Sequence, residues 1–355
     1  MKGSALSYAC GKTTEILLGK EEFKMKKFLS VLLAVAMMAT LAGCGSKKQE
    51  AAAGAEKVDT NTVAVGAIVQ ARDDIPEDEI YTLTSTIFEN LKAITEQHAK
   101  GAELSLEYAA SMTSVPYHPG AAKYFKEKGI EVASVKEGAG KGSARPLTFG
   151  TGGESGTYYA FGGVLGAYVS NNTDVKITTV SSGGSAANID DLAADNVQIA
   201  FCQSDVMSYA YNGERLFEGK AETGFCVVAA LYMEAVQIVT TNPSIKTVAD
   251  LKGKKVSVGA AGSGTYFNAI DALEIYGLKE SDISPVYQSF GDSTESLKDG
   301  KIDAAFVVAG APTTSIVDLA TATSVYLVGF DKEHADSLLA ASPYYSNYVV
   351  PAGTY

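Results

Sequence analysis

The sequence predicts an α/β protein built from two similar halves. From residue 146 onward, strand signals alternate with helix signals, which is typical of α/β layers with largely parallel sheets. Two segments, 146–170 and 244–278, follow one plan: a strand, a glycine-rich loop with a Thr-Tyr pair, and a helix. The repeated plan indicates two lobes that face each other.

Length and charge limit what the chain can do. Its 355 residues are enough for two domains with sizeable cores. The net charge of −12 disfavours binding to phosphate backbones and anionic lipids, so no nucleic-acid partner is expected. With only three arginines, a site for an anionic ligand must rely on backbone amides, hydroxyl groups and lysines.

The segment before residue 146 predicts a strand and several helices. Residues 61–72 are rich in Val, Ala and Ile and predict a strand, and residues 76–98 predict one helix with a proline near its start. Further helices are expected at 104–112 and 118–130. Residues 137–145, rich in Gly, Ala, Ser and Lys, predict a flexible linker.

The rest of the chain continues the alternation. The elements expected first are strands at 147–150, 175–181 and 197–203, and helices at 157–172, 185–196 and 204–213. The apolar run 226–241 is long for one strand and predicts two strands that cross between the lobes. Beyond the repeated unit we expect strands at 284–290 and 324–330, a helix–strand–loop–helix segment at 293–320, and a helix at 331–345.

Residues 25–44 predict a lipoprotein signal peptide. Two lysines precede an apolar run that is short for a membrane span. The run ends in Leu-Ala-Gly-Cys, which resembles a bacterial lipobox, so Cys44 is expected to be diacylated and followed by a tether at 45–56. The alternative is an ordinary secretory signal. The mature protein is expected outside the cytoplasm, lipid-anchored to the outer face of the cell membrane or periplasmic.

Residues 1–24 fit no targeting class. The stretch Gly-Lys-Glu-Glu-Phe-Lys-Met can be encoded by a purine-rich ribosome-binding site that precedes a start codon. We therefore expect translation to begin at Met25 and residues 1–24 to be a translated leader.

Cysteine and histidine usage argues against a metal site. There is no Cys-x-x-Cys pair, and His98, His118 and His334 are scattered along the chain. Cys202 and Cys226 lie in apolar, strand-like runs and predict buried thiols. A disulfide between them is the alternative, because the protein is expected outside the cytoplasm.

The loop at 150–159, Gly-Thr-Gly-Gly-Glu-Ser-Gly-Thr-Tyr-Tyr, is the first candidate binding element. A glycine-rich turn before a helix presents backbone amides to an anion. Its glycine spacing superficially matches a dinucleotide fingerprint, but no acid ends the next strand, and no P-loop lysine follows. One tyrosine of the pair should face a ligand; alternatively, both lie in the core. The candidate ligand-binding residues here are Thr151, Gly152, Gly153 and Tyr158.

Four further strand ends carry candidate binding residues. The loop after residue 180 offers hydroxyl groups at a helix start, unless Ser185 is only a helix cap. Gln203 and Pro312 follow apolar strands, where ligands of open α/β sheets bind. The candidates from these loops are Ser181, Ser182, Ser185, Asn188, Gln203, Ser263, Gly264, Thr265 and Pro312.

No catalytic constellation is present in the sequence. It contains neither Gly-x-Ser-x-Gly nor His-Glu-x-x-His, and no Ser or Cys has an obvious His partner. Hydrogen-bond donors without a nucleophile or a general base indicate binding rather than turnover, so we expect no enzyme activity and no cofactor.

The same segments resemble one receptor family. Residues 147–166, 180–206, 244–265 and 297–313, with 62–91 and 117–129, look like the TAXI-type substrate-binding receptors of tripartite ATP-independent periplasmic (TRAP) transporters. In combination they cover nearly all of residues 57–355. The resemblance implies a two-lobed periplasmic-binding-protein fold of type II, whose lobes close around a ligand by a hinge.

The order of these segments differs from that of the family. The family's closing segment comes first here, and joining the end of this chain to residue 56 restores the family order. The chain therefore resembles a circular permutant in which residues 137–145 bridge the old termini. The alternative is a fusion of two fragments in the wrong order. In the permuted chain, residues 57–238, with the linker at 137–145, are expected to form lobe 1 and residues 239–355 to form lobe 2.

The resemblance implies an extracytoplasmic receptor that captures a small organic anion or amino acid, such as glutamate or a dicarboxylate. It would deliver this ligand to integral-membrane TRAP permease subunits. Three alternatives remain: a binding protein of another transporter class, an enzyme on the same fold, and a ligand sensor.

Overall fold

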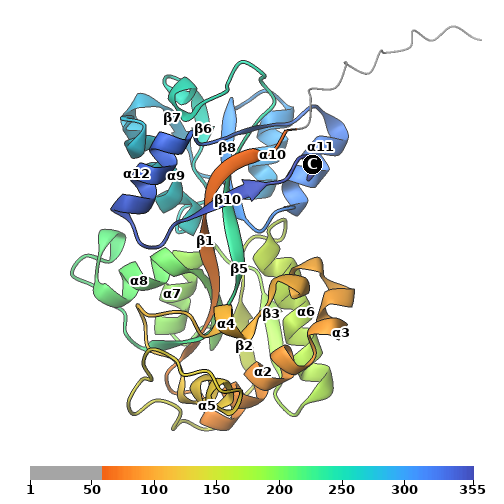
Figure 1. Cartoon of the computed structure of the whole chain (residues 1–355), viewed down its shortest axis with the longest axis vertical. Helices are drawn as coiled ribbons and strands as arrows, with labels where there is room; N and C mark the ends of the chain where they lie inside the picture. Colours follow the sequence, from red (N-terminus) through yellow and green to blue (C-terminus); the bar gives the residue numbers. More distant parts are fainter. Residues whose placement is uncertain (1–57) are drawn as a thin grey trace, which may run out of the picture. The chain divides into compact units, whose positions relative to one another are not determined.

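Two long antiparallel strands join the halves of the molecule. In the computed structural model, which describes residues 58–355, β1 (Thr60–Arg72) and β5 (Phe225–Thr240) run side by side through both halves (Figure 1). Nearly all their residues are buried. Strands buried on both faces read as continuous apolar runs, which is the pattern seen here.

The prediction of two strands at 226–241 is wrong, because β5 is one strand of 16 residues. Its pairing partner changes along its length while its backbone continues. The first part pairs with β1, and the last part pairs with β8 (Ala304–Ala309) and β9 (Tyr326–Val328). A strand that crosses between two halves can therefore exceed the usual strand length.

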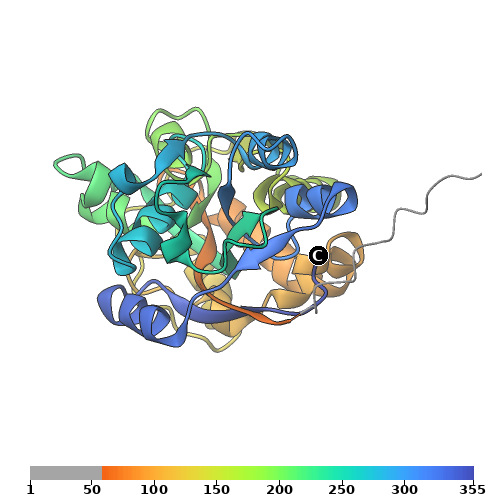
Figure 2. The ribbon, with the colours of Figure 1, turned by 90° about the horizontal axis from the view of Figure 1, so that it is seen from above.

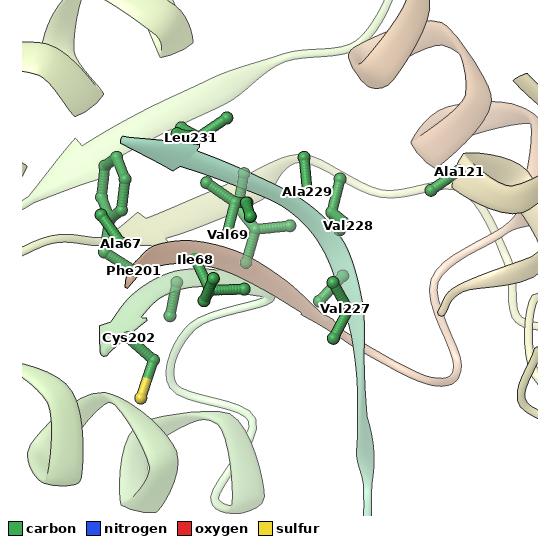
Figure 3. Close-up of a cluster of buried hydrophobic side chains, with 14 of the residues drawn as sticks. Ala67, Ile68, Val69, Ala121, Phe201, Cys202, Val227, Val228, Ala229 and Leu231 are labelled. Carbon is green, nitrogen blue, oxygen red and sulfur yellow. The ribbon is translucent and has the colours of Figure 1, made fainter. Parts of the chain in front are cut away.

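The first half packs around a hydrophobic core whose side chains come from β1, β4 and β5 and from the surrounding helices (Figure 3). Its remaining elements are α2 (Glu77–Glu89), α3 (Leu91–Gln97), η1 (Ala99–Glu103), α4 (Leu106–Ala109), α5 (Pro119–Glu127), β2 (Leu147–Gly150), α6 (Thr157–Asn172), β3 (Ile177–Val180), α7 (Ser185–Ala193), β4 (Ile199–Gln203), α8 (Ser204–Asn212) and η2 (Arg215–Phe217).

The second half has its own core, which includes the last part of β5. Seen from above, its helices lie around its strands (Figure 2). Besides β8 and β9, its elements are η3 (Val248–Leu251), β6 (Lys255–Ser257), α9 (Gly264–Ile275), η4 (Glu280–Asp282), β7 (Ser284–Val286), α10 (Phe290–Lys298), α11 (Thr314–Ala322), α12 (Lys332–Ala341) and β10 (Ser346–Val350).

The sheet topology confirms the predicted α/β class and the fold of periplasmic binding proteins. The strands follow the order β3-β2-β4-β1-β5-β8-β6-β7, with β10 on β1 and β9 on β5. Within each half the pairs β2–β3, β2–β4, β6–β7 and β6–β8 are parallel. The pairs that involve β1 or β5 are antiparallel. Two α/β halves are thus joined by two crossover strands.

The predicted helix at 76–98 is broken into two. Asn90 leaves helical geometry, with φ −125° and ψ 29°, and its side-chain amide donates to the carbonyl of Thr86 at 2.8 Å. Asparagine competes with the helix through such local hydrogen bonds. The result is α2 and α3, which both cover the first half.

The predicted linker lies against the first half. The Gly140 amide donates to the Asp73 carbonyl at 2.8 Å, and the Glu77 amide donates to the Gly140 carbonyl at 3.0 Å. Arg145 forms a bidentate ion pair with Asp195, with N···O distances of 2.8 and 2.9 Å. These bonds fix the segment in its middle and at its C-terminal end.

The lobe boundary at residue 238 stays a prediction. Val63 and Val65 of β1 pack in the second core, whereas Ala67 and the residues after it pack in the first. The predicted leader, signal peptide, Cys44 and tether lie outside the described residues.

Candidate ligand-binding site

A cavity of about 80 Å³ lies between the two halves. That space holds several water molecules or a small solute. The first half contributes loop residues, β5 contributes one acid, and the second half contributes the loops before α9 and α10. The lining residues are Gly152, Gly153, Gly156, Thr157, Tyr158, Ser182, Gly183, Gly184, Ser185, Gln203, Glu234, Ala260, Ser263, Gly264, Thr265, Ser289, Phe290, Val308 and Ala309.

Two helix starts reach this pocket without a side-chain cap. α6 follows Gly156 and α9 follows Ser263, and neither N-cap residue accepts a hydrogen bond from its helix. The first amides of a helix carry partial positive charge and are favourable neighbours for an anionic group. The two starts lie on opposite halves, and both Gly156 and Gly264 line the cavity.

The first backbone amides of α7 bind a carbonyl of the protein and are not available to a ligand. The amides of Ala186 and Ala187 donate to the carbonyl of Gly262, in the other half, at 3.0 and 3.2 Å. Ser185 is not the cap of this helix, since Gly184 occupies that position. The Ser185 hydroxyl instead accepts a hydrogen bond from the backbone N–H of Gln203 at 3.1 Å. Residues 182–187 therefore line the pocket and also form hydrogen bonds to the other half.

Most of the predicted site residues gather in the pocket. Those that line it are Gly152, Gly153, Tyr158, Ser182, Ser185, Gln203, Ser263, Gly264 and Thr265. Their contribution to ligand binding stays a prediction until a ligand is tested.

Four predicted residues lie outside the lining. Ser181 and Pro312 are exposed at the surface. The Thr151 hydroxyl donates to the Val180 carbonyl at 2.7 Å. The Asn188 amide donates to the carbonyls of Thr151 and Phe201, at 2.8 and 2.7 Å. Thr151 and Asn188 therefore hold the backbone of the neighbouring loops.

Tyr158 connects the core to the pocket. Its ring stacks on Phe201, with ring centroids 4.5 Å apart, and Phe201 stacks in turn on Phe149. Its hydroxyl donates to Glu234 Oε2 at 2.6 Å. Tyr159, its neighbour in the sequence, does not line the pocket. Of the two expected alternatives, the structure therefore has the one in which a single tyrosine of the pair faces the pocket.

Glu234 is a pocket residue that sequence reasoning missed. It is 2% exposed on β5, and it makes no ion pair within the described part of the chain. Burial raises the pKa of its carboxyl group to about 8, and the charge of Asp205 adds to this shift. The available signal was its position: Glu234 is the one charged residue in the 16-residue apolar strand.

Two buried polar atoms of the lining have no partner among residues 58–355. They are the side-chain carbonyl oxygen of Gln203 and the hydroxyl of Ser263. Buried polar groups are nearly always hydrogen-bonded in native proteins. The absence of protein partners marks both atoms as available to a ligand.

Several hydrogen bonds cross from one half to the other around the pocket. The Thr157 hydroxyl donates to the Gly310 carbonyl at 3.1 Å, and the Ser315 amide donates to the Ser155 carbonyl at 3.3 Å. Together with the α7 contacts, they hold the halves in a closed arrangement around the cavity.

A polar network behind the pocket joins α8 to α9. The Asn268 amide donates to Asp205 Oδ2 at 2.9 Å and to the Tyr345 hydroxyl at 2.8 Å. Tyr345 donates to Asp271 Oδ2 at 2.8 Å, and Arg215 forms an ion pair with Asp271. Burial raises the pKa of Asp205 from 3.8 to about 7.

We expect the variant Asp205→Asn to be more stable than the wild type above pH 7. A carboxyl group whose pKa is raised on folding lowers the free energy of unfolding as pH rises, here from about 4 to about 7. The amide has no such cost, so the difference should grow to a few kcal/mol, on the order of 1.4 kcal/mol per pKa unit. Denaturant unfolding at pH 4, 6 and 8 measures it. The exposed control Asp318→Asn should follow the wild type, and parallel profiles for Asp205→Asn would contradict the assignment.

Cys202 and Cys226 are both buried and free, so within residues 58–355 there are two thiols rather than a disulfide between them. Within residues 58–355 there is no cluster of three or more His, Cys, Asp or Glu side chains suited to a metal ion. None of the described helices has the length and apolar character needed to cross a membrane.

Two α/β halves that enclose a pocket and share two crossover strands define the class of periplasmic binding proteins. A family model matches residues 48–129 and 149–355, and the chain belongs to the NMT1-like family. The gap between the matched segments contains the predicted linker.

Individual relatives are more distant. A putative aliphatic sulfonates-binding protein of Escherichia coli K12 is 42% identical over 69 residues, which is 19% of this chain and 21% of that protein. The chain therefore matches only about a fifth of the length of this curated relative.

Solved structures show low similarity. The alkanesulfonate-binding protein SsuA of Xanthomonas axonopodis pv. citri, bound to MOPS, is 19% identical, with a TM-score of 0.37 over 53% of this chain and 62% of that chain. The aliphatic sulphonate-binding protein SsuA of Escherichia coli is 20% identical, with a TM-score of 0.35 over 56% and 69%. An ancestral arginine-binding protein bound to arginine is 18% identical, with a TM-score of 0.34 over 52% and 78%.

Proposed function

We propose that this protein is an extracytoplasmic solute-binding receptor for a small organic anion or amino acid, with a glutamate-like ligand as the first candidate. One observation carries the proposal: two uncapped helix starts and two unpartnered polar atoms converge on a cavity between hinged halves. This arrangement supplies hydrogen-bond donors and acceptors for a solute. Membership of the NMT1-like family and the solute-binding relatives support it.

Thermal unfolding of the purified protein against a panel of solutes tests this function. The panel contains acidic and neutral amino acids, dicarboxylates, alkanesulfonates and sugars. A ligand that binds only the folded state adds about 2.7 kcal/mol at a hundred times its Kd, which raises the unfolding temperature visibly. We expect a rise with an acidic amino acid. A cooperative transition that no panel member shifts would reject the ligand class.

A sulfonate receptor is the second candidate. The observation that favours it is the local 42% identity to the putative aliphatic sulfonates-binding protein. The alkanesulfonates in the panel separate the two candidates, because a rise with them alone would select this function.

The membrane partner and the anchor belong to the same proposal. We propose that the protein is held at the membrane through Cys44 and delivers its ligand to TRAP permease subunits, with the permease of another transporter class as the alternative. Co-purification of a membrane subunit with the wild-type protein identifies the partner. Release of the Cys44→Ser variant from the membrane fraction tests the anchor.

We also propose that the chain is a circular permutant of its family. β10 pairs with the beginning of β1, from Thr60–Val350 to Ala64–Ser346, and the Ala352 amide donates to Asp59 Oδ1 at 2.8 Å. These segments lie close enough for a short turn to connect them. A variant that joins residue 355 to residue 57 and opens the chain at 137–145 should fold and bind the same ligand, and failure to fold would contradict the proposal.

A further inference from the structure

We propose that Glu234 binds an ammonium group, so that the ligand is a zwitterion with an amino group and an acidic group. α-Amino acids and amino sulfonates share this chemistry. The inference rests on the proposed receptor function and names the class of ligand within it.

The pocket contains an acidic group as well as hydrogen-bond donors. The uncapped starts of α6 and α9 and the hydroxyl of Ser263 favour an anionic group. Glu234 lines the same cavity from β5, in the strand that joins the halves. A ligand in this cavity therefore meets partial positive charge at the helix starts and a carboxyl group on β5.

The carboxyl group of Glu234 is only partly satisfied by the protein. Its Oε2 accepts one hydrogen bond, from the Tyr158 hydroxyl. A carboxylate offers about four acceptor positions on its two oxygens. Burial raises the pKa of this carboxyl group to about 8, because an unpaired buried charge is costly. An ammonium group with three donors would stabilise the ionised form.

The nearest buried cation is already engaged. Lys100, which is 3% exposed, donates from Nζ to Glu103 Oε1 at 2.5 Å and to the Ala311 carbonyl at 2.9 Å. It forms no ion pair with Glu234, and its charge lowers the pKa of that carboxyl group by less than burial raises it. Asp205, buried nearby in α8, adds negative potential at Glu234. The electrostatic environment thus favours an incoming cation over a second anion.

Specificity follows from this arrangement. A dicarboxylate or a simple alkanesulfonate offers no cation to Glu234, so it cannot stabilise the ionised form of this carboxyl group. Unpaired and like charges are the means by which binding sites reject wrong ligands. The amino group should therefore decide which solutes bind.

Titration calorimetry with two matched ligand pairs tests the inference. L-Glutamate is compared with glutarate, and taurine with ethanesulfonate, because each pair differs by the amino group alone. In the wild type, at least one amine-bearing ligand should bind about a hundredfold more tightly than its partner. Glu234→Gln should remove most of this preference, and thermal unfolding checks that the variant is folded. The exposed control Glu96→Gln, on α3 and outside the pocket lining, should keep the wild-type preference.

The outcomes separate the two proposals. Binding of glutarate or ethanesulfonate as tightly as the amine-bearing partner would overturn the inference while the receptor function stands. An amine preference that survives in Glu234→Gln would also overturn it. If the wild type binds none of the four ligands and nothing else in the solute panel, the proposed function fails and the inference fails with it.

Discussion

Replacing Gly264 by valine is expected to weaken ligand binding about a hundredfold and to leave the fold intact. A Cβ atom at this position would lie 1.7 Å from Gln203 Oε1 and 2.9 Å from the Ser185 hydroxyl oxygen. Gly264 begins α9 in the second half, whereas both neighbours belong to the first. The side chain would therefore oppose closure without disturbing either core, at a cost of about 1–3 kcal/mol or more.

Calorimetric titration of the variant with the ligand of the wild type measures this effect. The matched control is Gly163→Val on α6, where a Cβ atom has no neighbour within 4 Å. The control should bind normally, and both variants should unfold cooperatively. Normal affinity in Gly264→Val would show that the halves need not meet as described.

Phe201→Ala is expected to cost about 3–5 kcal/mol of stability, the usual effect of removing a buried aromatic ring. Phe201 is 0% exposed and lies between Phe149, with ring centroids 5.1 Å apart, and Tyr158, at 4.5 Å. Tyr158 would lose its support, so its hydrogen bond to Glu234 and the affinity for ligand should weaken as well.

Denaturant unfolding measures the loss of stability. The exposed control Leu216→Ala should change the free energy of unfolding by no more than about 0.5 kcal/mol. Phe201→Ala as stable as this control would contradict the stacked core. Tyr158→Phe separates the two effects, since it keeps the ring and removes only the hydroxyl.

Much of the fold could be predicted from local sequence. α6 occupies Thr157–Asn172, the predicted range, because a glycine loop precedes it and apolar residues recur at helical spacing. α8 ends at Gly213, which has a left-handed φ of 71° that suits glycine. The single strand β5 could not be predicted, because its length depends on pairing with partners far away in the sequence.

The candidate site could be predicted in part, for a similar reason. Glycine-rich loops between a strand and a helix can be recognised in the sequence, so Gly152 and Gly264 could be predicted as site residues. Whether a polar side chain faces the ligand or the backbone depends on three-dimensional contacts. Asn188, for example, holds two loop carbonyls. Glu234 could not be predicted as a site residue, because it lies in an apolar run that indicated a buried strand.

A crystal structure of the protein with its tightest-binding solute tests the central claim most directly. We predict density for one solute in the cavity between the halves, with its acidic group at the starts of α6 and α9 and its amino group within hydrogen-bond distance of Glu234. A solute bound elsewhere, or an acidic group placed against Glu234, would contradict this account.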